Sequence, residues 1–149
     1  MADLHRALVA DPASFFEADY HAGFSLGRAQ LEEIHLAGVR RRFAEMRGQI
    51  GALDTLASEQ GIDRIDRIEQ LVPLLFPHTV YKSYPLSFLE RARFDRLTKW
   101  LDGLTTVDLS GVDASQVETI DEWIALLMRT TELQPNHTFG TTGKLSFIP

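Results

Sequence analysis

The feature that most limits the possible folds of this chain is a line of apolar residues at alternating spacings of three and four. Its members, which we call the apolar stripe, are Leu36, Val39, Phe43, Met46, Ile50 and Leu53. Residues at these spacings lie on one face of an α-helix. Four arginines and three glutamates occupy other positions between residues 32 and 47. The pattern predicts an amphipathic helix from Ser25 to about Arg47.

The charged face of this helix permits two interpretations. The helix packs on its own domain, or the stripe pairs with a second copy while the arginines contact nucleic acid. The net charge of −6 on 149 residues disfavours general binding to nucleic acid or anionic membranes. Gly48 and Gly51 interrupt a stripe that is already short for a coiled coil. We favour packing on its own domain, and keep as the alternative a small helical interaction module, a possible homodimer, pairing through Leu36–Leu53.

Further helices are predicted on both sides of the stripe. Asp11-Pro12 has the residue types of an N-cap and a first helical position. A second helix is expected over Ala52–Gln60, ended by Gly61. A short charged helix over Asp63–Leu71 then leads into Val72–Pro77, whose two prolines predict an extended, buried segment.

Two later helices are predicted from capping boxes, in which a Ser or Thr is followed three residues later by Glu. Ser87 with Glu90 starts the first, and Thr119 with Glu122 starts the second. Both are followed by apolar residues at helical spacing, namely Leu97, Trp100, Leu101 and Leu104, then Ile120, Trp123, Ile124 and Leu127.

A glycine- and threonine-rich loop lies within His137–Ser146. Two glycines bracket two threonines, and a lysine follows. Glycines let backbone N–H groups gather on one concave face, threonine hydroxyls add donors, and a lysine adds positive charge. The P-loop pattern is not met, since it needs Gly at 138 and Ser or Thr at 145. The residue types of its flanks, Asn136–Phe139 and Leu145–Ile148, predict two short strands, so the loop is expected to connect the strands of a β-hairpin. Its donors and positive charge predict that it binds phosphate.

This loop resembles the phosphate-binding loop of the adenylate-forming enzymes, usually written [ST]-S-G-T-T-G-x-P-K. The likeness is nearest to the phenylacetate–CoA ligases and the acyl-protein synthetases of bacterial bioluminescence. Phe139, Leu145 and Ser146 stand where the family has Ser, Pro and Lys. The family's order of segments upstream of the loop is also similar to that found here in Gln30–Phe43, Asp63–Gln70, Leu74–Pro77, Lys82 and Tyr84-Pro85.

The resemblance implies an ATP-dependent ligase that activates a carboxylic acid as an acyl-adenylate and passes the acyl group to a thiol acceptor. ATP and Mg²⁺ would be its cofactors, and the loop would hold the phosphates without transferring protons. No catalytic or metal-binding residue is assigned in this chain. The residues implied to bind the nucleotide phosphates are Thr138, Gly140, Thr141, Thr142, Gly143 and Lys144.

The resemblance also implies that the chain is the N-terminal part of a larger α/β enzyme and is inactive alone. We expect an α+β, mostly helical fold. It would comprise an N-terminal extension (1–27), a helical region (28–135) and the phosphate-loop hairpin (136–149).

Several other functions are disfavoured by what the sequence lacks. There is no cysteine, so disulfides and thiolate metal sites are excluded, and the five histidines include no H-x-x-x-H pair. The N-terminus has no signal-peptide core, and no apolar run approaches the length of a membrane span. A cytoplasmic protein is therefore expected.

Overall fold

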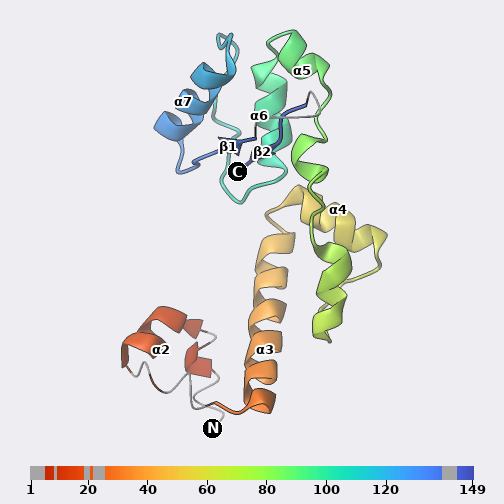
Figure 1. Cartoon of the computed structure of the whole chain (residues 1–149), viewed down its shortest axis with the longest axis vertical. Helices are drawn as coiled ribbons and strands as arrows, with labels where there is room; N and C mark the ends of the chain where they lie inside the picture. The colour runs from red at the N-terminus through yellow and green to blue at the C-terminus, as the bar shows by residue number, and fades with distance from the viewer. Residues whose placement is uncertain (1–5, 9, 19–20, 22–25, 139–143) are drawn as a thin grey trace.

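The chain is mostly helical, with one small two-stranded antiparallel sheet near its C-terminus (Figure 1). The structure is a computed structural model that describes residues 6–8, 10–18, 21, 26–138 and 144–149, without the side chains of residues 16–18. The expectation of a mostly helical α+β fold is confirmed at this coarse level.

Helix α2 (Pro12–Ala18) begins where the sequence predicts. The Asp11 carboxylate accepts hydrogen bonds from the Ser14 N–H at 3.1 Å and from the Ser14 hydroxyl at 2.6 Å. These bonds favour the charged carboxylate and hold the pKa of Asp11 below its usual value. Asp11 is therefore the N-cap of α2.

The apolar stripe is divided between two helices. Helix α3 (Arg28–Arg47) begins after Gly27, whose N–H donates to the Gln30 side chain at 2.9 Å, rather than at Ser25. Helix α4 (Gly51–Glu59) begins after a sharp turn. Ile50 is the residue that precedes α4, and Leu53 lies within α4. These last two members of the stripe therefore do not continue the helical face of α3.

The end of α4 follows the prediction for Gly61. This glycine has a φ of +64°, which L-residues with a side chain rarely adopt. Its N–H donates to the Ser58 carbonyl at 3.1 Å, and the next N–H, from Ile62, donates to Ala57 at 2.9 Å. This is the Schellman arrangement that ends many helices.

A first core cluster forms where α3, α4 and the following segment meet. Its buried members are Phe43, Ala57, Ile62, Ile65 and Leu74, and the stripe residues Leu36, Val39 and Leu53 pack against them. The interpretation that the helix packs on its own domain is thus confirmed for most of the stripe.

Arg47 ties α4 to α3 on the polar side of this cluster. Its guanidinium contacts Asp54 at 2.8 Å and Asp63 at 3.1 Å, and it also donates to the Ile62 carbonyl at 3.1 Å. The same group lies over the Phe43 ring. Only 23% of the Arg47 side chain is exposed, so this arginine is part of the packed structure and not of a free basic face.

The prediction of an extended, buried segment over Val72–Pro77 is wrong. Its first three residues continue a 3₁₀ helix, η2 (Ile68–Leu74), that includes Pro73. Of its apolar side chains, Leu74 is buried while Val72 and Leu75 are 68% and 67% exposed. A 3₁₀ turn uses i to i+3 hydrogen bonds, and here the Leu75 N–H donates to Val72 across the proline.

The single helix predicted from Ser87 is also wrong, because the chain forms two. A short 3₁₀ helix, η3 (Val80–Lys82), precedes α5 (Ser87–Glu90) and α6 (Phe94–Asp102). No side-chain cap is made at α5, because its first turn already starts with the Phe88 N–H bound to Pro85. Between the two helices Ala92 has a φ of +48°, which ends α5 as Gly61 ends α4.

Helix α7 (Ile120–Thr130) carries the predicted capping box. The Glu122 N–H donates to the Thr119 hydroxyl at 3.2 Å, and the Glu122 carboxylate accepts from the Thr119 N–H at 3.1 Å. The carboxylate also accepts from Glu118. These bonds lower the pKa of Glu122, since they favour its charged form.

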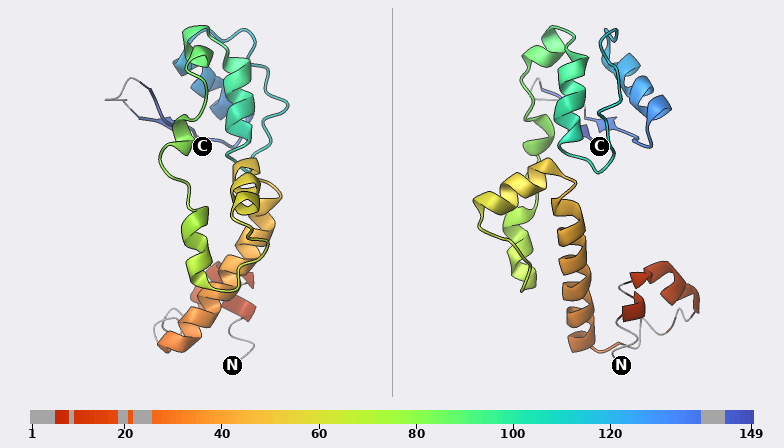
Figure 2. Two further views of the ribbon diagram at one scale, coloured as in Figure 1. Left: turned by 90° about the vertical axis from the view of Figure 1, so that its right-hand side faces the viewer. Right: turned by 180° about the vertical axis from the view of Figure 1, so that it is seen from behind.

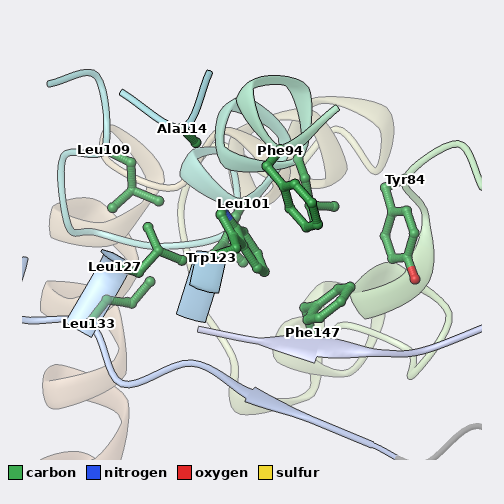
Figure 3. Packing of buried hydrophobic residues seen from close by; sticks show 10 residues of the cluster. Tyr84, Phe94, Leu101, Leu109, Ala114, Trp123, Leu127, Leu133 and Phe147 are labelled. Carbon is green, nitrogen blue, oxygen red and sulfur yellow. The ribbon is translucent and has the colours of Figure 1, made fainter. Parts of the chain in front are cut away.

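The second and larger core cluster joins α6, α7 and the sheet (Figure 3). Trp123 is fully buried at its centre and lies against Phe94 and Phe147 at ring-centroid distances of 6.2 and 5.2 Å. Leu109 and Ala114, from the polar connection between α6 and α7, complete it.

The beginning of α4 contacts the end of α6, which connects the parts of the chain that carry the two core clusters. The Ala52 N–H donates to the Gly103 carbonyl at 2.9 Å, at the C-terminal end of α6. Gly51 lies close to Gly103 as well. In two further views, α3 and η2 extend to one side of this junction, and α6, α7 and the sheet to the other (Figure 2). Among the described residues, no helix combines the length and apolar character needed to cross a bilayer.

Candidate functional site

The predicted hairpin is present, with strands shorter than expected. Strand β1 (Asn136–His137) pairs antiparallel with β2 (Phe147–Ile148), with Asn136 opposite Ile148. Beyond the strands, the Thr138 N–H donates to the Ser146 carbonyl at 3.1 Å, and the Ser146 N–H donates to the Thr138 hydroxyl at 3.3 Å. The hairpin therefore closes at Thr138 and Ser146, which fixes the two ends of the loop.

Two of the six residues predicted to bind phosphate are described by the structure, and they lie at opposite ends of the loop. These are Thr138 and Lys144. The other four, Gly140, Thr141, Thr142 and Gly143, lie outside the described residues, as does Phe139.

Thr138 has a structural contact in addition to its predicted role. Its oxygen accepts the Ser146 N–H, which holds the side chain at the base of the loop. A hydroxyl has one hydrogen to donate and two lone pairs. Because the Thr138 hydroxyl accepts this bond, its hydrogen remains available for the predicted donation to an oxygen anion.

Lys144 lies on Tyr84. Its ammonium donates to the Tyr84 main-chain carbonyl and lies 4.5 Å from the centroid of the Tyr84 ring. A lysine ammonium has three N–H donors, so a contact with this carbonyl does not prevent a contact with an anion. The positive charge predicted at the rim of the loop is thereby held at a defined place.

Tyr84 is the residue of this site whose importance sequence reasoning missed, since the sequence predicts no contact between it and the loop and places it only within the order of segments upstream of the loop. Its hydroxyl donates to the Leu145 carbonyl at 2.7 Å, and its side chain is fully buried. Burial raises the pKa of the Tyr84 phenol, so the hydroxyl stays protonated and able to donate at neutral pH. The sequence signals at Tyr84 were the proline that follows it and its place in the order of segments upstream of the loop.

The hairpin rests on aromatic side chains. Phe147 of β2 is fully buried and contacts the rings of Trp123 and Tyr84 at centroid distances of 5.2 and 5.5 Å. The close-up view shows the Phe147 side chain between these two residues (Figure 3). The ring of His137, on β1, lies 6.2 Å from that of Phe147. Strand β2 is therefore the part of the hairpin that joins the core.

Metal ions in proteins are commonly bound by groups of histidine, cysteine, aspartate and glutamate side chains. Within the described ranges, no three such side chains come together. Because the Lys144 ammonium is positively charged, the C-terminal end of the loop suits an anion better than a cation.

A separate groove of about 1050 Å³ lies along α3. It is bordered by residues of α3 and η2 and by the segment around Pro12. Two of its lining residues, Ile68 and Leu75, are apolar side chains that are 43% and 67% exposed. Arg41 and Arg42 lie at its border and pair with Glu45 on the same helix.

No protein family, characterised protein or solved structure matched this chain in comparisons of sequence and structure.

Proposed function

We propose that this chain supplies the phosphate-binding hairpin of an ATP-dependent enzyme that activates a carboxylic acid as an acyl-adenylate and transfers the acyl group to a thiol. The observation that carries the proposal is the hairpin with its Gly-Thr-Thr-Gly-Lys loop. Its two ends are fixed by Thr138 and Ser146, and its lysine lies at the loop's C-terminal end.

The chemistry assigned to the loop is electrostatic. Backbone N–H groups around Gly140–Gly143, the threonine hydroxyls and the Lys144 ammonium would stabilise the charge on the β- and γ-phosphates and on the leaving pyrophosphate. The adenine, Mg²⁺ and acyl sites, the rest of the α/β fold and the thiol acceptor would come from residues outside these 149.

The first measurement is the mass of the native protein that contains this sequence, captured from its own cells with an antibody against the chain. A product several-fold heavier than 16.8 kDa supports the proposal. A native product of 16.8 kDa argues against a role in a larger enzyme.

The second measurement is ATP–pyrophosphate exchange by that intact enzyme. Replacing both Thr141 and Thr142 by Ala should lower exchange by about 100-fold, the size of effect seen when an oxyanion donor is lost. Replacing Thr130 and Thr131, which lie at the end of α7, is the matched control and should leave exchange unchanged. Full exchange in the Thr141/Thr142 variant would exclude the loop assignment.

The alternative is an interaction module that pairs with a second copy of itself. The observation that favours it is the groove along α3, with Ile68 and Leu75 exposed at its border. Phe43 is buried in its own core, so a charge placed there would unfold the chain instead of testing pairing. The exposed residues of the groove are the better positions to alter.

Sedimentation velocity over a range of concentrations tests this alternative. Dimerisation that is lost in the variant Ile68→Glu/Leu75→Glu would support it. The control Leu86→Glu/Met128→Glu changes two apolar residues that are similarly exposed and lie outside the groove. A chain that stays monomeric at high concentration would leave the groove without this role.

A further inference from the structure

Tyr84 contacts the end of the phosphate loop through three different groups. Its hydroxyl binds the Leu145 carbonyl, its main-chain carbonyl binds the Lys144 ammonium, and its ring lies beneath the same ammonium. One residue thus holds both a charged side chain and the backbone of the next residue. The three contacts come from a segment about 60 positions earlier in the chain.

Tyr84 is itself held rigidly. Its ring packs against Trp100 at 5.0 Å and Phe147 at 5.5 Å, and its side chain is fully buried. On the neighbouring residue, Ser83, the hydroxyl accepts the Trp100 indole N–H at 2.9 Å. A residue fixed in this way can define the position of a long side chain that contacts it, because its own rotamer is already determined by packing.

A free lysine side chain has about 2 kcal/mol of rotamer entropy to lose when it is fixed in one place. Contact with Tyr84 imposes much of that loss before any ligand arrives. An anion that then meets Lys144 binds a group that is already in place, which is the advantage of preorganisation. Neither the ring face nor a single carbonyl neutralises the ammonium, so its charge remains available to attract an anion.

We propose that Tyr84 is the positioning residue that holds Lys144 ready for a phosphate-bearing ligand. This inference rests on the proposed function and explains how Lys144 is held in place before the ligand binds. Tyr84 acts through Lys144 and through the backbone of Leu145, and it need not touch the ligand. Loss of the Tyr84 hydroxyl frees the Leu145 carbonyl, so the backbone beside Lys144 is no longer fixed, although the carbonyl and ring contacts of the ammonium remain.

The experiment measures the affinity of the intact enzyme that contains this chain for inorganic pyrophosphate by isothermal titration calorimetry. Four proteins form a double-mutant cycle: the wild type, Tyr84→Phe, Lys144→Met and the double variant. Tyr84→Phe keeps the ring and the fold while it removes the bond to Leu145. We expect it to weaken pyrophosphate binding about three- to tenfold, the net worth of about one hydrogen bond.

The cycle distinguishes positioning from a merely structural role. If Tyr84 acts through Lys144, Tyr84→Phe has little further effect once Lys144 is Met, because no ammonium remains to be misplaced. Tyr81→Phe is the matched control, since it removes the hydroxyl of a nearby tyrosine whose ring contacts Phe76 and not Lys144. It should bind pyrophosphate as the wild type does.

Two results would overturn the inference while leaving the proposed function intact. In one, Tyr84→Phe has a lower melting temperature and unchanged pyrophosphate affinity. In the other, the losses from Tyr84→Phe and Lys144→Met multiply in the double variant. An intact wild-type enzyme that does not bind pyrophosphate would instead overturn the loop's proposed role, and the role of Tyr84 with it.

Discussion

The indole N–H of Trp123 donates to the hydroxyl of Thr98 at 2.8 Å inside the larger core cluster. The same hydroxyl donates to the Phe94 carbonyl one helical turn earlier, also at 2.8 Å. Both residues are buried, so this threonine satisfies a polar group of the tryptophan that water does not reach. The relationship joins α6 to α7 beneath the hairpin.

Thr98→Val should therefore destabilise the chain by about 1–3 kcal/mol, the cost of leaving a buried donor without a partner. The matched control is Thr130→Val, because Thr130 makes the same bond to a carbonyl four residues earlier, is exposed and accepts no indole N–H. Urea unfolding measures both free energies. Equal losses would show that the indole bond contributes nothing specific.

Ala92→Gly should stabilise the chain by about 0.5–1 kcal/mol. Ala92 has a φ of +48° at the end of α5, a conformation in which a Cβ costs energy and glycine is accommodated readily. The same substitution at Ala125, an exposed position inside α7, should destabilise by about 1 kcal/mol. Thermal unfolding of both variants tests the contrast, and a loss of stability at both positions would contradict it.

Gly61→Ala should have the opposite effect to Ala92→Gly, with a loss of about 1 kcal/mol. The space around Gly61 is open, so a Cβ would meet no other atom and only its φ of +64° opposes the change. Gly111→Ala is the control, because its surroundings are equally open and its φ is not positive. Denaturant midpoints of the two variants should differ clearly.

The capping carboxylate of Glu122 should make stability depend on pH. Its pKa is lowered in the folded chain, so it binds a proton more readily when the chain is unfolded. The stabilisation is present above the ordinary glutamate pKa of about 4.3 and is lost as the pH falls through the lower folded value. The difference in urea midpoint between wild type and Glu122→Gln should be largest near pH 7 and shrink toward pH 3. Glu132→Gln, at an exposed position after α7, should leave the midpoint nearly unchanged at each pH.

Arg47→Lys should lower the urea midpoint, because an ammonium cannot bind Asp54, Asp63 and the Ile62 carbonyl with the planar geometry of a guanidinium. Arg28→Lys is the matched control. Arg28 pairs with Glu32 on one exposed helix face, with 93% of its side chain accessible, where such pairs contribute little. A similar midpoint in the two variants would mean that Arg47 does not join α4 to α3.

The sequence predicts the elements whose signals are local. Asp11, Gly61 and the pair Thr119 and Glu122 each act within a few residues, and the structure has each as predicted. The predictions failed where neighbouring turns compete. The capping box expected at Ser87 is absent because the turn from Pro85 starts the helix earlier.

The candidate site could be predicted only in part for a related reason. The hairpin and its lysine follow from local residue types, and the strands are confirmed. Tyr84 reaches Lys144 and Leu145 from a distant part of the chain, and no local pattern encodes such a contact. A likeness in the order of segments pointed to Tyr84-Pro85 without indicating what the tyrosine touches.

The bond between Tyr84 and Leu145 spans 61 positions, and this has a consequence for how the loop comes into being. A sheet of two such short strands has little stability of its own. Closing so long a stretch of chain costs entropy that is regained only when the aromatic residues beneath it pack. We therefore expect the ends of the loop to come into register only when Tyr84 and Trp123 pack against Phe147 beneath the hairpin. A ligand that binds only the registered loop would favour the collapsed chain by mass action, so that binding at the hairpin and folding of the surrounding core form one equilibrium.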